Sequence, residues 1–464
     1  MKKKKLNFQK FIFRLLFYFS VILIIFISIK LFNNFEKNFN YLYYYFICSF
    51  IVFFYFLFIL IKKYSEYFFI ITISILISFY IFEFYYVFKN INNEFQNTYE
   101  KKEYDKNILK LNFYNQNKEN DNSTIIGFNS LNYFKSSQKL LPLTHASNSN
   151  IIGCNEDGFY SKFVSDKYGF NNPNDVWEEN KKNIIILGDS FVEGSCVFRK
   201  NNIVSNIQKL NSNFNFINLG IGGTSIISQY AILKEFIKKN TVQIFLFYYE
   251  GNDLNEIKIE SKNQILLNYL KNPNFTQNLK ENTKVSDEII RNNFEIEKKI
   301  FLQKKIKFHN HDFQKNIKKK ISYLSDAIKL KNSRKLLTYL HEKKTPQERR
   351  HLDKEIILYK NTLLKIKTLL DKENIELVFV YLPEFGRYDT YKYYKYKFKD
   401  YSQYHYRKIL EILKKENIRH IDIHQLIFLQ EKDPLDCFPQ RQPGHYNAKC
   451  YFKISEILNK FIVK

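Results

Sequence analysis

Asn183–Phe191 reads NIIILGDSF. Its first six residues are an apolar run of the length of a buried strand, and the run closes at Gly188. A serine directly after such a strand, at the start of a helix, would lie at the carboxyl edge of a parallel sheet, where α/β folds bind ligands. We therefore expect an exposed Ser190 hydroxyl close to backbone N–H groups that can stabilise an oxyanion.

Further apolar runs of strand type follow at 214–219, 243–248 and 375–381, and residues 418–423 are also expected to form a strand. Helical spacing lies between or after them, at 225–239, 354–372, 404–416 and 447–463. Strands that alternate with helices predict a parallel, doubly wound α/β sheet.

Three polar blocks stand beside these elements. Gly220-Ile221-Gly222-Gly223-Thr224 follows the second strand, Gly251-Asn252-Asp253 follows the third, and Gly444-His445-Tyr446-Asn447-Ala448-Lys449 precedes the last helix. A G-D-S triplet alone is a weak signal, because Ser often caps a helix and Asn often occupies a turn. Four blocks in order at element ends are far more specific.

With these blocks, the chain from about residue 150 onward resembles the SGNH (GDSL) hydrolase superfamily, flavodoxin-like α/β ester hydrolases and acyl-transferring enzymes. The resemblance implies a serine nucleophile, a histidine general base and an oxyanion hole, with no metal and no cofactor. The residues it assigns are Ser190 (nucleophile and backbone donor), His445 (base), Gly223 (second backbone donor, with Gly220 or Gly222 as alternatives) and Asn252 (side-chain amide donor).

One position departs from the family pattern. The family usually places an Asp two or three residues before the histidine, where this chain has Pro443 and Gln442. The nearest upstream acids are Asp436 and Asp433, which are not at the family spacing. A remote carboxylate, a backbone carbonyl in a Ser-His dyad, or loss of activity would each account for the difference.

The segment that precedes the first strand, from Cys154 to Trp177, contains CNEDGFY and SDKYGFNNP. It resembles the lead-in of membrane-anchored bacterial SGNH proteins, and its Gly-Phe-Asn-Asn-Pro run is expected to form a turn. We expect no catalytic role for it.

Four of the five cysteines lie after residue 150, in the part of the chain that resembles the SGNH superfamily. In an oxidising compartment an even number suggests two disulfides, and the spacing favours Cys154–Cys196 and Cys437–Cys450. The first would tie the lead-in to the nucleophile turn, and the second would close a short loop around His445. Buried free thiols are the alternative. The fifth cysteine, Cys48, lies in an apolar segment.

Residues 1–89 form an expected membrane anchor with apolar segments at 11–32, 41–61 and 67–88, each about 20 residues long. A cleaved signal peptide is the alternative for the first segment, but its apolar run is long and two more follow. Lysines at 2–5, 62 and 63 favour a cytoplasmic N-terminus and second loop. Three spans would place the rest in the periplasm or its equivalent.

Residues 90–150 are expected to link the anchor to an SGNH-like domain at 151–464, which carries a Lys-rich helical insertion at about 254–353. The insertion is a solvated excursion, a cap over the site, or a surface for anionic glycans or lipids.

The net charge of +26 does not favour nucleic acid as a partner, because the expected topology exports the domain. The expected function is an ester hydrolase or acyl transferase acting on O-acylated envelope polysaccharide; the rival is a catalytically silent glycan-binding or assembly protein.

Overall fold

The computed structural model describes residues 2–33, 49–56, 109–117, 124–127, 140–300, 353–388 and 392–463, with scattered residues between 67 and 85. The described residues up to 85 belong to one compact unit, and those from 109 onward belong to another. Each unit is described by itself.

The first unit begins with helix α1 (Lys2–Asn33), which contains the first expected span, 11–32. Most of the expected spans 41–61 and 67–88 lie outside the described residues. Within the parts of the chain that the structure describes, no helix has the combined length and apolarity needed to cross a membrane.

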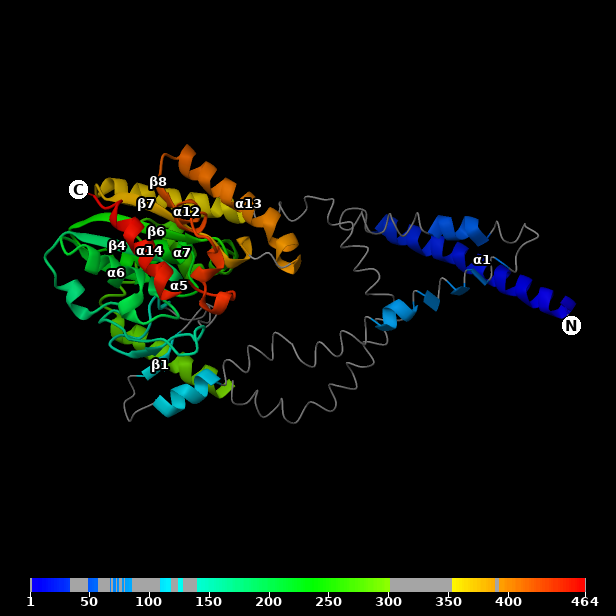
Figure 1. The fold of residues 1–464 in the computed structure, drawn as a ribbon, viewed down its shortest axis with the longest axis horizontal. Helices are drawn as coiled ribbons and strands as arrows, with labels where there is room; N and C mark the ends of the chain where they lie inside the picture. The colour runs from blue at the N-terminus through cyan, green and yellow to red at the C-terminus, as the bar shows by residue number, and fades with distance from the viewer. Residues whose placement is uncertain are drawn as a thin grey trace. The chain divides into compact units, whose positions relative to one another are not determined.

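The second unit is built on a five-stranded parallel sheet (Figure 1). The strands are β4 (Asn183–Gly188), β5 (Asn215–Gly220), β6 (Thr241–Tyr249), β7 (Glu376–Leu382) and β8 (Arg419–Asp422), in the spatial order β5-β4-β6-β7-β8. Counted along the chain this order is 2-1-3-4-5, which is the flavodoxin-like arrangement. The predicted parallel, doubly wound sheet is therefore confirmed.

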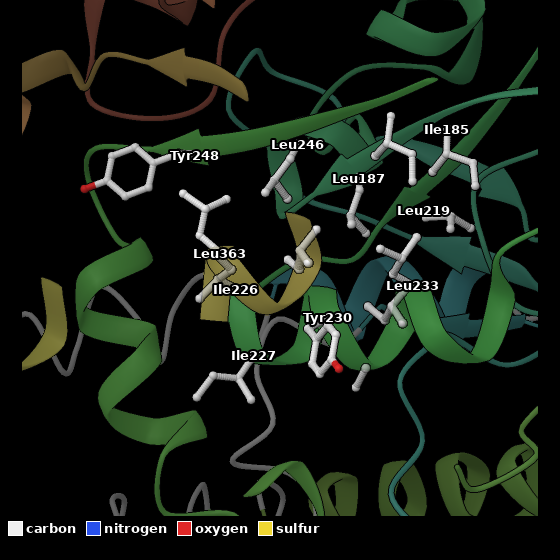
Figure 2. Packing of buried hydrophobic residues seen from close by; sticks show 14 of the residues in the cluster. Ile185, Leu187, Leu219, Ile226, Ile227, Tyr230, Leu233, Leu246, Tyr248 and Leu363 are labelled. Carbon is white, nitrogen blue, oxygen red and sulfur yellow. The ribbon is translucent and has the colours of Figure 1, made fainter. Parts of the chain in front are cut away.

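Helices cover both faces of this sheet. On one face α7 (Ile226–Phe236) and α12 (Asp353–Lys372) pack against residues such as Ile185 and Leu187, as Figure 2 shows. On the other face α6 (Ile203–Leu210) and α14 (Ala448–Asn459) pack against residues such as Ile184 and Ile186. Alternate residues of a strand point to opposite faces, so a run buried on both sides must be continuously apolar.

The second unit also contains one long helix and several short helical segments. α13 (Lys392–Lys415) adds Ile409 and Leu413 to the core on the α7 face. The short helical segments are η2 (Asn174–Trp177), α5 (Ser190–Glu193), η3 (Arg199–Asn201), η5 (Phe385–Arg387), η6 (His424–Phe428), η7 (Pro434–Cys437) and η8 (Pro439–Arg441).

The lead-in has its own small sheet of β1 (Thr124–Ile126), β2 (Asn150–Ile152) and β3 (Lys162–Val164), in that order. Beyond β3 the carboxylate of Asp166 accepts hydrogen bonds from the Phe170 N–H, the Asn172 amide and the Trp177 indole. Asn172 in turn pairs with both backbone groups of Asn218 in β5. The Gly-Phe-Asn-Asn-Pro run is thus fixed against the main sheet.

The expected insertion begins with α8 (Asp253–Glu260) and α9 (Gln264–Lys271). Leu254 and Leu266 from these helices are buried in the core beside α7, and the Glu260 carboxylate accepts the backbone N–H groups of Ser225 and Ile227. This first part is therefore packed structure and not a solvated excursion. Residues 301–352 of the insertion lie outside the described residues.

Candidate active site

Ser190 is the first residue of α5, directly after β4. The helix cap is Asp189, whose carboxylate accepts the N–H of Phe191 at 3.0 Å. The Ser190 hydroxyl is therefore not used as a cap. α5 ends after one turn at Gly194, which has a φ of 82°, a conformation that glycine adopts without strain. This tight turn presents Ser190 at the carboxyl edge of the sheet.

His445 lies just before α14 and faces Ser190. Its Nε2 is 2.8 Å from Ser190 Oγ. On its other side Nδ1 is 3.0 Å from Glu156 Oε1, and the His445 backbone N–H donates to Glu156 Oε2 at 2.6 Å. A carboxylate only accepts hydrogen bonds, so Nδ1 carries the proton and Nε2 is free to accept the serine hydroxyl. Ser190, His445 and Glu156 form a continuous hydrogen-bonded chain.

The acid beside His445 is not one that the sequence suggested. Asp433 and Asp436 both form ion pairs with Arg441, at 2.5 Å and 2.9 Å. The expectation that one of them orients His445 is wrong, and so is the alternative of a backbone carbonyl. The physical reason is that Glu156, from the lead-in, already occupies the Nδ1 side of the ring.

Two disulfides join segments that carry Ser190, His445 and Glu156. Their pairings are the predicted ones, Cys154–Cys196 and Cys437–Cys450. The first joins the lead-in two residues before Glu156 to a position six residues after Ser190. The second joins η7 to α14, on either side of His445. Both predicted bridges are confirmed, and the first holds the acid beside the nucleophile turn.

Gly444 leaves the room that Glu156 needs. A Cβ atom at this position would lie 2.3 Å from Glu156 Oε2. Such an approach is far inside van der Waals contact, so any larger residue would push the carboxylate away from His445.

The ionisation of His445 is set by opposing effects. Burial lowers the pKa of its imidazole, but the hydrogen bond and charge of Glu156, together with the charges of Asp189 and Glu193, outweigh burial and raise it. The ring also packs on Phe191, with ring centroids 4.8 Å apart. The Glu156 carboxylate therefore favours the imidazolium that a general base becomes during reaction.

Asp189, which caps α5, is a buried acid beside Ser190. Burial raises the pKa of its carboxyl to about 6, against the lowering effects of the Phe191 N–H, the His445 charge and a hydrogen bond from the Asn252 side chain. Burial, and next the charge of Asp189, raises the pKa of Asp253 well above its usual range. The start of α5 and the start of α8 thus each carry a buried carboxyl group, and the charge of one disfavours the charge of the other.

The expected oxyanion residues gather at the same edge. Gly223 has a φ of 72°, in the left-handed region, within the loop after β5. The Gly220 N–H donates to Asn218 Oδ1 at 2.8 Å, which commits it and removes Gly220 from the candidate donors. The Asn252 side chain does not cap α8 and contacts Asp189 instead. The oxyanion roles of Gly223 and Asn252 stay predictions.

Sequence reasoning missed Glu156 because the site brings together residues 289 positions apart. One signal could have found it. The predicted Cys154–Cys196 bridge already placed the lead-in beside Ser190, and Glu156 is the carboxylate two residues after Cys154.

The solved structures that are similar to the chain at low identity include the following three. A putative lipolytic protein of the G-D-S-L family from Desulfitobacterium hafniense is 11% identical, with a TM-score of 0.29, over 61% of this chain and 100% of that chain. An acetyl xylan esterase is 12% identical, with a TM-score of 0.33, over 61% of this chain and 100% of that chain. A member of the same lipolytic family from Veillonella parvula is 12% identical, with a TM-score of 0.28, over 60% and 96%.

No family model matches the chain, and no curated protein matches it.

Proposed function

We propose that the chain is a serine ester hydrolase that works through an acyl-enzyme on Ser190. One observation carries this proposal: Ser190 Oγ, His445 and the Glu156 carboxylate form a continuous hydrogen-bonded chain at the carboxyl edge of the sheet. That is the arrangement of nucleophile, base and orienting acid that activates a serine hydroxyl, whatever the order of the residues in the sequence.

The geometry gives each group a task. Ser190 Oγ attacks the ester carbonyl carbon as its proton passes to His445 Nε2. Collapse of the tetrahedral species breaks the bond to the alcohol oxygen, which takes the proton from Nε2 and leaves. A water molecule then gives a proton to Nε2 and attacks the acyl carbon, which releases the carboxylic acid and restores the Ser190 hydroxyl. Throughout, Nδ1–H donates to Glu156, and backbone N–H groups near Ser190 are available to the oxyanion.

Two features favoured the rival proposal, a silent binding protein on the same fold: the absence of the usual acid before His445 and the long insertion at about 254–353. Glu156 fills that role sterically and electrostatically, because it accepts from Nδ1 and raises the pKa of the ring. The first of these two features therefore no longer favours the rival.

A fluorophosphonate probe tests the proposal, since it reacts only with an activated serine. We expect labelling of the wild-type chain, none of Ser190→Ala, and wild-type labelling of Ser205→Ala, a serine of α6 outside the site. Absence of labelling in the folded wild-type chain, or equal labelling of Ser190→Ala, would reject the enzyme and leave the binding protein.

We further propose that the enzyme acts outside the cytoplasmic membrane, held there by its apolar N-terminal segments, on O-acylated envelope polysaccharide. The two disulfides support an oxidising compartment, and the lysines at 2–5 support an internal N-terminus. Acetate released from an O-acetylated polysaccharide, but not from the same polymer after alkaline deacetylation, would support this substrate class. Acetyl groups recovered on an added sugar acceptor would instead identify a transferase.

A further inference from the structure

The catalytic acid and base share their surroundings with two sulfur atoms. His445 Nδ1 lies 3.0 Å from Glu156 Oε1 and 3.3 Å from Cys196 Sγ. The ligand atoms of Cys154, Glu156, Cys196 and His445 all lie within 4.8 Å of one another. No other group of three or more such side chains is found in the described part of the chain.

These four side chains are those that hold Zn²⁺ in proteins: two thiolates, an imidazole nitrogen and a carboxylate oxygen. Zinc bonds to such ligands are about 2.0–2.3 Å long, so two ligands of a tetrahedral site lie roughly 3.3–3.8 Å apart. The contacts of His445 Nδ1 with Glu156 and with Cys196 are already close to this spacing. The two sulfur atoms, joined at present by a covalent bond, would have to separate, and the remaining pairs, all within 4.8 Å, would adjust to the tetrahedral spacing.

We propose that the chain binds one Zn²⁺ through Cys154, Cys196, His445 and Glu156 when the two cysteines are not joined in a disulfide. Zinc displaces one proton from each thiol as it binds. A chain whose cysteines have not yet been oxidised is in this state without the action of any reductant.

Zinc binding and the proposed hydrogen bonds of Ser190, His445 and Glu156 cannot occur at the same time. Zinc on Nδ1 takes the lone pair there, so the neutral imidazole carries its proton on Nε2 and cannot accept the proton of Ser190. Glu156 is drawn to the metal at the same time. This consequence rests on the proposed function, whereas zinc binding itself does not.

Oxidation of Cys154 and Cys196 to a disulfide would release the zinc ion. Thiol–disulfide exchange with a protein disulfide joins Cys154 to Cys196, transfers two electrons to the partner, and leaves the partner as two thiols. The sulfurs are then no longer thiolates, the ion loses two of its four ligands, and Glu156 again accepts from His445 Nδ1. The bridge seen in the structure on this account excludes the ion and leaves Glu156 beside His445.

The cluster is within reach of an ion from solvent. The side chain of Glu156 is 23% exposed and that of His445 is 19% exposed. The other disulfide, Cys437–Cys450, has both cysteines buried and offers a matched pair for comparison.

The test measures metal content directly. The full chain is treated with a trialkylphosphine, which is oxidised to the phosphine oxide as each disulfide becomes two thiols, then exposed to zinc chloride and desalted. We expect about one Zn²⁺ per reduced chain and none per oxidised chain. Cys437→Ser/Cys450→Ser should retain one Zn²⁺ after reduction, and Cys154→Ser/Cys196→Ser should retain none. No zinc on the reduced wild-type chain, or as much on Cys154→Ser/Cys196→Ser as on wild type, would overturn the proposal.

A second measurement, Co²⁺ binding, keeps the test valid if the variant Cys154→Ser/Cys196→Ser does not fold. Co²⁺ added to the reduced wild-type chain should give the thiolate charge-transfer and d–d bands of a tetrahedral site. His445→Ala, which keeps both cysteine pairs, should weaken the affinity for Co²⁺ by at least about 10²-fold, since even the loss of a group behind a ligand costs up to that much. An unchanged affinity would remove His445 from the site and contradict the proposal.

Ester hydrolysis is followed in parallel. Zinc should inhibit the reduced chain, a chelator should restore it, and the oxidised chain should be unaffected. Zinc bound at one per chain together with no hydrolysis in either state would support the metal site and reject the proposed function.

Discussion

At the scale of single residues, the site depends on Glu156. In the proposed mechanism an acid at the Nδ1 side of the ring orients the general base, and nothing requires that acid to be close in sequence. Here it comes from the lead-in, and it binds both the ring and the backbone N–H of His445. The two contacts fix the position of the histidine as well as its tautomer.

Replacing Glu156 by Gln should therefore lower kcat for ester hydrolysis by roughly 10²–10⁴, because the amide can present its NH₂ to the ring and favour the wrong tautomer. Asp436→Asn is the control, since Asp436 pairs with Arg441 and should leave kcat unchanged. A large loss for Asp436→Asn with none for Glu156→Gln would show that the acid has been assigned to the wrong residue.

The pH dependence of kcat/KM should carry the same signature. Hydrolysis requires neutral His445, so the rate should rise with pH around an apparent pKa above the ordinary 6.5 of histidine, the direction that Glu156 imposes. In the residual activity of Glu156→Gln the midpoint should move to lower pH, because burial continues to lower the pKa and the carboxylate no longer opposes it. A midpoint that stays in place would mean that Glu156 does not act on the imidazole.

At the scale of elements, β4, β5, β6 and β7 could be predicted because they are largely apolar runs buried on both faces. β4 was expected at 183–188 and spans Asn183–Gly188. α13 begins at Lys392, well before the expected start at 404. The sequence did not predict this earlier start because the first turns of the helix are rich in Lys and Tyr and show no apolar stripe. Ser190 and His445 were found through their motifs. Glu156 was not, because its role depends on a tertiary contact that no local pattern encodes.

The two disulfides should differ in what their removal does. In the chain-entropy model, with sequence separations of 42 and 13, they stabilise the fold by about 4 and about 3 kcal/mol. Cys154→Ser/Cys196→Ser should in addition lower kcat, because it releases the tether of Glu156, while Cys437→Ser/Cys450→Ser should mainly lower the melting temperature. Denaturation curves and kcat measured on both variants check this. Equal kcat losses at equal stability would contradict a special role for the first bridge.

At the scale of the whole molecule, the proposal joins an exported catalytic unit to an N-terminal anchor. A reporter enzyme that is active only outside the cytoplasm, fused after Lys464, should be active. A fluorescent protein that matures only inside, fused at the same place, should stay dark. The opposite pair of results would reject the proposed location and, with it, an oxidising compartment for the disulfides.

The central claim is that Ser190 is the nucleophile of a working catalytic site. Rapid mixing with an activated acetyl ester, acid quenching and peptide mapping test it most directly. We predict a burst of alcohol release approaching one equivalent per chain, with the acetyl group recovered on the peptide that contains Ser190 and absent from Ser190→Ala. An acetyl group on another residue, or steady turnover by Ser190→Ala equal to that of the wild-type chain, would contradict the account.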